Sequence, residues 1–358
     1  MRWLRYVLAA ASVVVLVGCS GWSADLELQP ESPPLSVGMV ETIRDRGHLV
    51  CGVSGTSVGF SVVTDSEMAG FDADWCRAVA AAVVGDADAV VFVELTSAER
   101  FAAVASGQVD VLFRTATHTI SRDTQLGVDF GPVVFYDGQQ VMARSSDGFH
   151  AGSSVADLHN TVVCANAGTT TEANIVDAAN AAGVEITLRT FDDHQAAIAA
   201  FVDGFCDAVT GDGAGLVAGR SAYQPDMRQW VIFPSVPLSR EPLAPVYAES
   251  DPQFAAVVDW VVYATIIAES NDITAVNVDA VAADPPNSET ARLLGVEGDL
   301  VAATGLDRDA FYRVVKQVGS YGEIFARNLT PVGVVRDGTL NELSQWGRGG
   351  LIYAPPIR

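Results

Sequence analysis

The stretch from His48 to Phe113 decides the fold class, and it reads HLVCGVSGTSVGFSVVTDSEMAGFDADWCRAVAAAVVGDADAVVFVELTSAERFAAVASGQVDVLF. Its apolar segments alternate between strand-like and helix-like, and Thr96-Ser97-Ala98-Glu99 has the capping-box spacing that opens a helix. The segments are the strand 48–53, the helix 72–84, the strand 90–95, the helix that carries Phe101 and Val104, and the strand 109–113. This order predicts a parallel sheet with helices covering its faces.

The same order of segments returns in the second half of the chain. They are the strand 161–165, the helix 170–182, the strand 185–190, the helix 194–201 and the strand 207–210. In both halves an aspartate, Asp110 or Asp207, follows a glycine turn at the third strand. We therefore predict two α/β lobes of similar plan. Ligands of such sheets bind beyond the carboxyl ends of the strands, so the two lobes should line a shared cleft.

Two extended segments, 132–144 and 241–248, are expected to cross between these lobes, and an apolar helix at 254–268 should pack on the first lobe. The predicted boundaries are 37–140 and 244–285 for the first lobe, 141–243 for the second lobe, and 286–358 for a C-terminal helical extension on the first lobe. The fold class predicted is therefore α/β, with two lobes, two crossing strands and this extension.

The N-terminus has the layout of a secretory signal. Two arginines precede an apolar run from Tyr6 to Val17, which is too short to span a bilayer as a helix. The sequence Leu16-Val17-Gly18-Cys19 resembles the lipobox of bacterial lipoproteins, which implies a lipid on Cys19; an ordinary cleaved signal is the alternative. We expect residues 1–18 to be a lipoprotein signal peptide and the proline-containing residues 19–36 to be a tether.

The chain is strongly acidic, with a formal net charge of −23 over 358 residues. Removal of the signal would take away two arginines and lower the charge to about −25. A polyanion needs clusters of Lys and Arg to displace its counterions, and the sequence has no such stripe. Nucleic acid is therefore not an expected partner, and no cofactor is expected.

Four cysteines remain after Cys19. An exported chain sits in an oxidising compartment, where an even number of thiols tends to pair. We expect the disulfides Cys51–Cys76 and Cys164–Cys206, one in each lobe. No pair has the close Cys-x-x-Cys spacing of a zinc or redox site, so no metal site is expected.

Several short segments, in order along the chain, form a recognisable series. They are Cys51-Gly52-Val53-Ser54, Gly70-Phe71-Asp72-Ala73-Asp74-Trp75-Cys76-Arg77-Ala78-Val79-Ala80, Ser121-Arg122-Asp123-Thr124, Phe135-Tyr136-Asp137-Gly138-Gln139, Gly168-Thr169-Thr170-Thr171-Glu172, Tyr321-Gly322-Glu323 and Gly350-Leu351-Ile352-Tyr353-Ala354-Pro355-Pro356. From about Glu41 to Arg358 the chain resembles the type II periplasmic solute-binding proteins of polar amino-acid ABC importers. The closest likeness is to the general L-amino-acid binders of the glutamate/glutamine/aspartate/asparagine group.

A free amino acid brings a carboxylate and an ammonium group, and both need partners when they are buried. The resemblance assigns Arg122 to the α-carboxylate, held by its planar fork, with hydrogen bonds from Thr115 and Thr117. It assigns Asp212, in a glycine-rich turn after the strand 207–210, to the α-ammonium. The alternatives are a surface salt bridge for the arginine and simple turn chemistry for the aspartate.

Further ligand contacts are expected from both lobes. Asn166 and Thr170 stand where a strand ends and a helix begins, so hydroxyls and free N–H groups there can hold the carboxylate; a helix cap is the alternative. Phe71 resembles the aromatic residue that covers the ligand side chain, with core packing as its alternative. Ser57 stands where narrower-specificity relatives carry a second aromatic residue, a place that Phe60 could fill instead.

Arg114 offers a second cation, which favours glutamate, aspartate, glutamine or asparagine as the ligand; pairing with Asp110 or Asp137 is the alternative. The sequence shows no Ser/His/Asp or Cys/His constellation, so we expect no enzyme activity, although exported dehydratases and peptidoglycan lyases share this architecture. A sensor module is a third alternative. We expect an exported monomer, anchored by lipid outside the cell membrane or in the periplasm, that delivers a free L-amino acid to ABC permease subunits.

Overall fold

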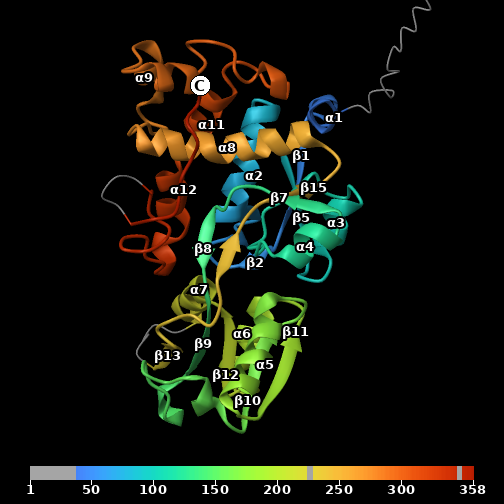
Figure 1. Cartoon of the computed structure of the whole chain (residues 1–358), viewed down its shortest axis with the longest axis vertical. Coiled ribbons are helices and arrows are strands. Elements are labelled where there is room, and N and C mark those ends of the chain that lie inside the picture. The colour runs from blue at the N-terminus through green and yellow to red at the C-terminus, as the bar shows by residue number, and fades with distance from the viewer. Residues whose placement is uncertain (1–37, 224–228, 345–348) are drawn as a thin grey trace, which may run out of the picture. The chain divides into compact units, whose positions relative to one another are not determined.

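Two five-stranded sheets organise the part of the chain that this computed structural model describes, residues 38–223, 229–344 and 349–358 (Figure 1). The first lobe contains the sheet β5-β1-β6-β15-β7, and the second lobe contains the sheet β11-β10-β12-β9-β13. The first sheet consists of β1 (Leu49–Val53), β5 (Val90–Glu94), β6 (Val111–Leu112), β7 (Val128–Phe130) and β15 (Val246–Ala248). The second consists of β9 (Gln139–Arg144), β10 (Thr161–Asn166), β11 (Ile186–Phe191), β12 (Ala208–Asp212) and β13 (Trp230–Phe233).

The strands of each predicted strand-helix-strand series pair in parallel. In the first sheet β1 pairs with both β5 and β6, and in the second sheet β10 pairs with both β11 and β12. The sheets are nevertheless mixed, because β15 and β9 run antiparallel to their neighbours. Both of these strands belong to the segments that cross between the lobes, so the crossings complete the sheets as well as connect them.

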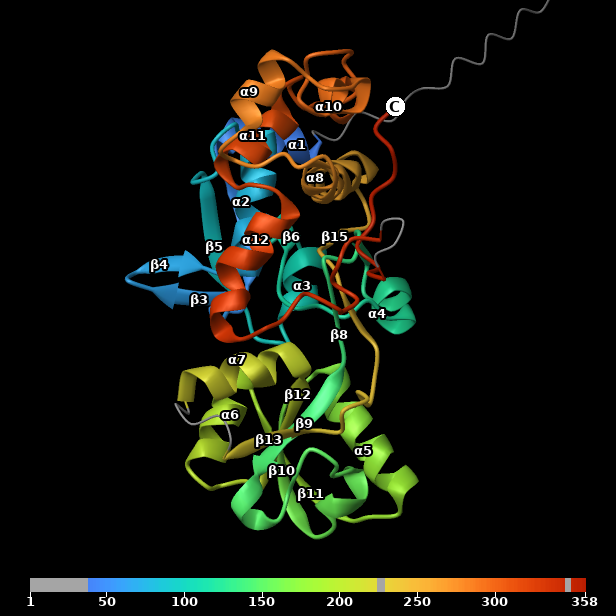
Figure 2. The ribbon, with the colours of Figure 1, turned by 90° about the vertical axis from the view of Figure 1, so that its left-hand side faces the viewer.

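Helices cover both faces of the second sheet (Figure 2). Residues of α5 (Thr170–Ala182) pack with Val163 on one face, and residues of α6 (His194–Val202) pack with Cys164 on the other. Successive side chains of a strand point to opposite faces, so a strand covered on both sides needs an unbroken apolar run. This is why the sequence 161–166 contains so few polar residues.

Several helices of the first lobe lie around its sheet. They are α1 (Met39–Arg46), α2 (Phe71–Val83), α3 (Arg100–Ala105) and α4 (Ile120–Gln125), with a small sheet of β2 (Thr56–Ser57), β3 (Ser61–Thr64) and β4 (Glu67–Ala69) beside them. The predicted capping box is present ahead of α3. The Thr96 N–H donates to Glu99 Oε2 at 3.1 Å, and the Glu99 N–H donates to Thr96 Oγ1 at 3.3 Å.

Two crossing strands join the lobes, as predicted. β8 (Phe135–Asp137) and β14 (Glu241–Leu243) pair antiparallel, with Tyr136 opposite Pro242. β8 continues directly into β9 of the second sheet, and β14 is followed by β15 of the first sheet. The two connections therefore lie side by side and form the hinge between the lobes (Figure 1).

The long helix α8 (Pro252–Ser270) follows the hinge. It is apolar on almost every face, so by length and composition alone it could cross a membrane. Its side chains are instead largely buried against α2 and the C-terminal helices, and burial on several faces explains its composition. Its start is fixed by Asp251, whose carboxylate accepts the Phe254 N–H at 2.9 Å.

The C-terminal extension packs on the first lobe. Its helices are α9 (Val278–Ala283), α10 (Ser288–Leu293), α11 (Ala310–Gln317) and α12 (Tyr321–Asn328). Tyr321 and Phe325 enter the core, and the Tyr321 hydroxyl donates to the Val134 carbonyl at 2.9 Å. Farther along, Asn341 bonds the hinge strand twice, since its Oδ1 accepts the Tyr136 N–H at 2.7 Å and its Nδ2 donates to the Tyr136 carbonyl at 2.9 Å.

Each lobe contains one disulfide, Cys51–Cys76 in the first and Cys164–Cys206 in the second, in the predicted pairs. The two aspartates at the third strands also have matching roles. Asp110 accepts the Val50 N–H at 2.8 Å, and Asp207 accepts the Val162 N–H at 2.7 Å, so each ties its strand to the neighbouring one. The expected lipid site, Cys19, lies outside the described residues, as do the rest of the signal and the tether.

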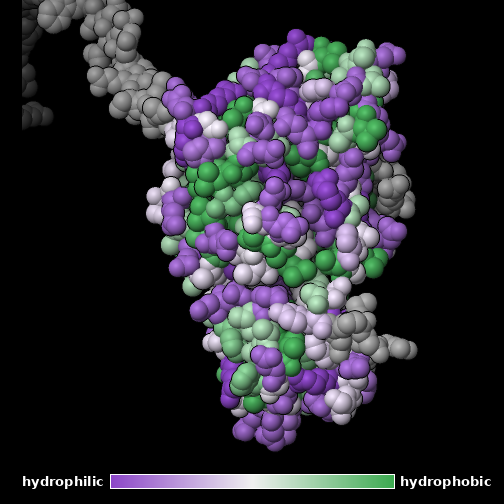
Figure 3. Space-filling view, turned by 180° about the vertical axis from the view of Figure 1, so that it is seen from behind, coloured by the Kyte–Doolittle hydropathy of each residue, from purple (hydrophilic) through white to green (hydrophobic). Residues whose placement is uncertain are grey.

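The face of the molecule opposite to that of Figure 1 is largely hydrophilic, and hydrophobic side chains appear in groups between the polar ones (Figure 3).

Candidate binding site

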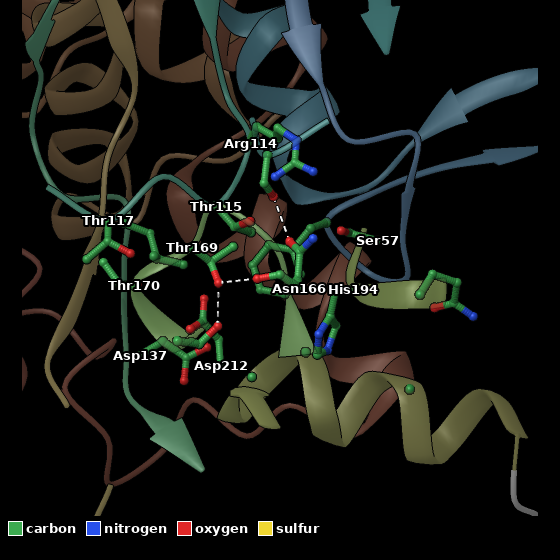
Figure 4. A pocket seen from close by; sticks show the side chains of 18 of the residues that line it. Ser57, Arg114, Thr115, Thr117, Asp137, Asn166, Thr169, Thr170, His194 and Asp212 are labelled. Carbon is green, nitrogen blue, oxygen red and sulfur yellow. Dashed lines mark hydrogen bonds between the residues drawn. The ribbon is translucent and has the colours of Figure 1, made fainter. Parts of the chain in front are cut away.

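A cavity lies where the two lobes meet, and it contains about 770 Å³ of space, including the part that opens to solvent (Figure 4). The side chains around it are mostly polar and come from both lobes. They are Ser57, Val58, Phe60, Ser97, Arg100, Arg114, Thr115, Thr117, Asp137, Asn166, Thr169, Thr170, Thr171, His194, Gln195, Gly211, Asp212, Gly215, Gly219 and Leu243. The lobes also touch directly across it, because Ser97 Oγ donates to Asn166 Oδ1 at 2.6 Å.

Arginines of the first lobe supply the positive charge of the site. Arg100 and Arg114 line the cavity, and the two are linked because Arg100 Nη1 donates to the Arg114 carbonyl at 3.0 Å. Burial, together with repulsion from Arg114 and Arg122, lowers the pKa of Arg100 well below its ordinary value. Three guanidinium groups held this closely favour an anionic ligand, since an anion relieves both their repulsion and their desolvation.

Aspartates supply the negative charge. Asp212 stands at the end of β12, where α7 (Gly213–Tyr223) begins, and Asp137 stands at the end of β8; Figure 4 shows the two carboxylates close together. Burial raises the pKa of Asp137 to about 7, although N–H groups of Gly138 and Ala214 bond it and act in the opposite direction. Burial, Asp137 and Glu241 raise the pKa of Asp212 well above its usual range. A cation placed between these carboxylates would be strongly favoured.

The loop before α5 presents hydroxyl and amide groups to the same space. Asn166 and Thr170 both line the cavity. The Thr170 hydroxyl donates to Glu241 Oε2 at 3.0 Å, which ties the second lobe to the hinge strand β14. Thr169 caps α5 by accepting the Glu172 N–H at 3.2 Å. The loop is therefore a helix cap and a cavity wall at once.

His194, the first residue of α6, lies at the far side of the cavity from the hinge residues (Figure 4). Burial lowers its pKa to about 4, so the ring is neutral at pH 7. Its Nε2 atom is buried and has no hydrogen-bond partner within the described residues. A neutral ring with an unpaired nitrogen suits a polar group of a ligand.

The family model of the bacterial extracellular solute-binding proteins, family 3, matches residues 49–264, which run from β1 into α8 and include both sheets. The chain belongs to this family. It is 41% identical to the glutamate/glutamine/aspartate/asparagine-binding protein BztA of Rhodobacter capsulatus, over 90% of this chain and 94% of the relative. It is 38% identical to the general L-amino acid-binding periplasmic protein AapJ of Rhizobium johnstonii, over 98% of each chain.

Among solved structures, a periplasmic binding protein of an ABC transporter from Brucella ovis with glutathione bound is 39% identical. It superposes with a TM-score of 0.83 and covers 90% of this chain and 99% of its own. The likeness extends beyond the residues that the family model matches, so these relatives share the C-terminal extension of this family 3 protein as well as its two lobes.

The cavity includes six of the residues that the sequence proposed for ligand contact. They are Arg114, Thr115, Thr117, Asn166, Thr170 and Asp212. Within the described residues Arg114 forms no salt bridge with Asp110 or Asp137, the carboxylates named as its alternatives, and Asp110 pairs with Arg46 instead; the charges of Asp72 and Asp193 act to raise the pKa of Arg114. Ser57 and Phe60 also line the cavity.

The position of Phe71 differs from the expectation that its ring covers the ligand side chain. Its side chain is fully buried beneath the site, where its ring meets Trp75, Phe135, Tyr321 and Phe325 edge to face at about 6 Å. It therefore belongs to the core and does not line the main cavity. Phe60, which contacts Phe71 from the cavity side, is the aromatic ring that a ligand can reach.

Arg122 lies just behind the cavity wall. Its Nη1 donates to the Thr117 carbonyl at 2.9 Å, and its guanidinium lies 5.0 Å from the centre of the Phe101 ring. It pairs with neither neighbouring aspartate in a salt bridge; Asp123 instead lies 3.4 Å from His118. The charge of Arg122 does reach the second lobe, because it lowers the pKa of Asp212. Arg122 itself does not line the cavity; the guanidinium groups that line it together with Asp212 are those of Arg100 and Arg114.

Five polar residues of the cavity were not predicted as ligand contacts: Ser97, Arg100, Asp137, His194 and Gln195. Ser97 lies within the capping box and Arg100 directly follows it, so both read as ordinary helix-start residues. Asp137 was considered only as a partner for Arg114. All of them except Asp137 lie at or next to an end of a predicted strand or helix, and that position was the available signal.

Proposed function

We propose that this protein is the extracytoplasmic solute-binding component of an ABC importer and that it holds a free polar L-amino acid in the cavity between its lobes. The observation that carries the proposal is the separation of charge across the cavity. Arg100 and Arg114 come from the first lobe, and Asp212 comes from the second. An amino-acid zwitterion carries a carboxylate and an ammonium group a few atoms apart, so it can pair with the arginines and with the aspartate at the same time.

In this proposal Thr115 and Thr117, which line the cavity, hold the α-carboxylate together with Arg122. The guanidinium of Arg122 lies behind Thr117, where Nη1 donates to the Thr117 carbonyl, and it turns toward the ligand on binding. Asp212, with Asp137 next to it, takes the α-ammonium. The ligand side chain then reaches toward Arg114 and His194, where a cation and a neutral ring favour a carboxylate or an amide. This arrangement supports the glutamate, glutamine, aspartate and asparagine class.

Binding would close the hinge and stabilise the closed form through contacts that only that form makes. The direct bond between Ser97 and Asn166 is one such contact, because its two residues come from different lobes. The permease subunits would then receive the loaded protein. We further propose that it acts as an exported, lipid-anchored monomer without enzyme activity. Relatives that match nearly the whole chain are named as binding proteins, which supports a binding role.

A thermal-shift screen with the twenty amino acids, followed by calorimetry, tests the proposal. Arg122→Ala should abolish binding of every ligand, a loss of roughly 100-fold or more, and should also lower the unfolding temperature of the free protein, because it leaves the Thr117 carbonyl without its donor. Arg114→Ala should weaken glutamate and aspartate more than glutamine and asparagine. A flat screen across all twenty would refute the proposal, and full affinity in Arg122→Ala would refute the carboxylate assignment.

Glutathione is a second candidate ligand. Its γ-glutamyl end has the same free ammonium and carboxylate, so the same charged residues could hold it. The cavity is also lined by Val58, Gln195 and Gly219, and its space of about 770 Å³, including the part open to solvent, leaves room for a longer ligand. Adding glutathione to the screen separates the two candidates: tighter binding than that of every free amino acid would establish the peptide as the ligand.

A further inference from the structure

The segment Gly70-Phe71-Asp72-Ala73-Asp74 places two carboxylates at the start of α2, and the backbone fixes them rigidly. Gly70 has φ of 130°, and a Cβ there would lie 2.2 Å from the Phe60 carbonyl oxygen, so only glycine fits. The next two N–H groups bond the loop before β3, because Phe71 donates to the Gly59 carbonyl at 2.9 Å and Asp72 to the Phe60 carbonyl at 2.8 Å. Asp72 therefore has little freedom to move.

The Asp72 side chain lies beneath the binding cavity. Only 3% of the residue is exposed, and it does not line the main cavity. It borders instead a small space of about 220 Å³ that Arg114 and Thr115 also border. Arg114 and Thr115 line both spaces, as do Phe60 and Leu243, so these four residues form the wall between the small space beside Asp72 and the ligand site.

Two features of that wall require support from behind. Thr115 has φ of 41°, a left-handed conformation that a β-branched residue adopts only under constraint. Thr115 borders the same small space as Asp72, and its N–H acts to lower the pKa of the Asp72 carboxyl. Arg114 is 4% exposed and its Nε donates to the Leu95 carbonyl at 2.7 Å, while the charges of Asp72 and Asp193 act to raise its pKa.

We propose that Asp72 is a positioning residue that holds Thr115 and Arg114 in the geometry required to bind the ligand. Its oxygen Oδ2 is buried without a hydrogen-bond partner within the described residues, although a carboxylate in an apolar core normally has all its acceptors satisfied. Burial raises the pKa of Asp72 to about 7, and Arg114, the Thr115 N–H and Arg100 oppose the rise. Burying a carboxylate with an unpaired oxygen destabilises the fold, so a role in the binding site explains Asp72 better than a role in packing does.

Asp74 provides a matched control. It lies on the same helix, is also buried, and accepts hydrogen bonds from Arg327 Nη2 and Asn328 Nδ2, both at 2.6 Å. These partners belong to the C-terminal extension, and Asp74 does not line the cavity. Asp72→Asn and Asp74→Asn are therefore the same chemical change at two buried positions of one helix. The first lies beneath the cavity, and the second contacts the C-terminal extension.

The inference rests on the proposed function, and the test uses the full chain with the best amino-acid ligand from the screen. Asp72→Asn should weaken binding about tenfold or more without lowering the unfolding temperature of the free protein. Asp74→Asn should lower the unfolding temperature and leave the affinity within about twofold. Asp72→Ser, a smaller neutral acceptor, gives the same comparison if the asparagine variant does not fold.

A double-mutant cycle with Arg114→Gln separates positioning from general stabilisation. If Asp72 acts through Arg114, the double variant should bind only slightly more weakly than Arg114→Gln alone. Three results would each overturn the inference. One is a double variant whose loss of affinity is the product of the two single losses. The others are an Asp72→Asn affinity within about twofold of the wild type and a loss of affinity in Asp74→Asn equal to that in Asp72→Asn. A wild-type protein that binds no amino acid would instead contradict the proposed function itself.

Discussion

Ligand binding should weaken as the pH falls from 8 to 5, because the site must lose a proton to accept an ammonium group. Burial raises the pKa of Asp137 to about 7 and raises the pKa of the neighbouring Asp212 as well. The ligand-free pair therefore retains a proton near neutral pH, which the cation displaces on binding. His194 contributes little to this effect, since its pKa of about 4 keeps the ring neutral throughout the range.

The magnitude follows from the position of the pKa. If one proton leaves for each ligand bound, the dissociation constant rises by up to tenfold for each pH unit below the pKa, or roughly 100-fold between pH 7 and pH 5. Both carboxylates are partly exposed to the cavity, and Arg100 and Arg122 favour the ionised form of Asp212. We therefore expect a loss between about 10-fold and 100-fold.

Calorimetry at pH 5, 6, 7 and 8 measures this dependence, with glutamine as ligand because its side chain does not titrate. Repeating the pH 6 titration in two buffers of different ionisation enthalpy counts the protons released. Asp137→Asn should flatten the profile, which distinguishes this pair from Asp72. A dissociation constant that changes less than about twofold over the range, or binding without proton release, would refute the reasoning.

Three further outcomes can be checked on the ligand-free protein. The pKa of Asp137 is raised from 3.8 to about 7, so its contribution to stability is present at low pH and lost as the pH rises through 7; Asp137→Asn should therefore raise the melting temperature at pH 8 but not at pH 4. Replacing Cys164 and Cys206 by Ala opens the longer disulfide loop, with a sequence separation of 42, and urea titration should show a loss of about 2–4 kcal/mol. Asn341→Ala removes both hydrogen bonds to Tyr136 and should lower the free energy of unfolding by about 1–3 kcal/mol in the same assay. An unchanged urea midpoint would contradict a stabilising role for these two bonds.

The fold was largely predictable because hydrophobic periodicity follows secondary structure directly. The helix expected at 170–182 is observed as Thr170–Ala182, and the two crossing segments contain the hinge strands. The antiparallel pairing of β9 and β15 was not predicted. Strand direction within a sheet depends on where a crossing segment arrives in space, and the local sequence does not encode that.

The family resemblance indicated several residues that line the cavity, such as Asp212 at the end of β12, whereas its residue type and position alone fitted simple turn chemistry equally. Phe71 shows the limit of this reasoning. A phenylalanine at a helix start can point into a cleft or into the core, and only the C-terminal residues Tyr321 and Phe325, far away in the sequence, decide the matter. Arg100 was missed for a related reason, because its role depends on helix α3 facing the second lobe.

The two hydrogen bonds between Asn341 and Tyr136 bear on the position of the hinge between the lobes. Tyr136 of β8 pairs with Pro242 of β14 and is hydrogen-bonded to Asn341 of the extension, so we expect this part of β8 to move with the first lobe. Rotation between the lobes is then expected around Gly138, the residue between β8 and β9. A side chain at Gly138 would lie 2.5 Å from Pro237 and 2.8 Å from the Ser239 carbonyl oxygen, so this joint has no room for anything larger than glycine.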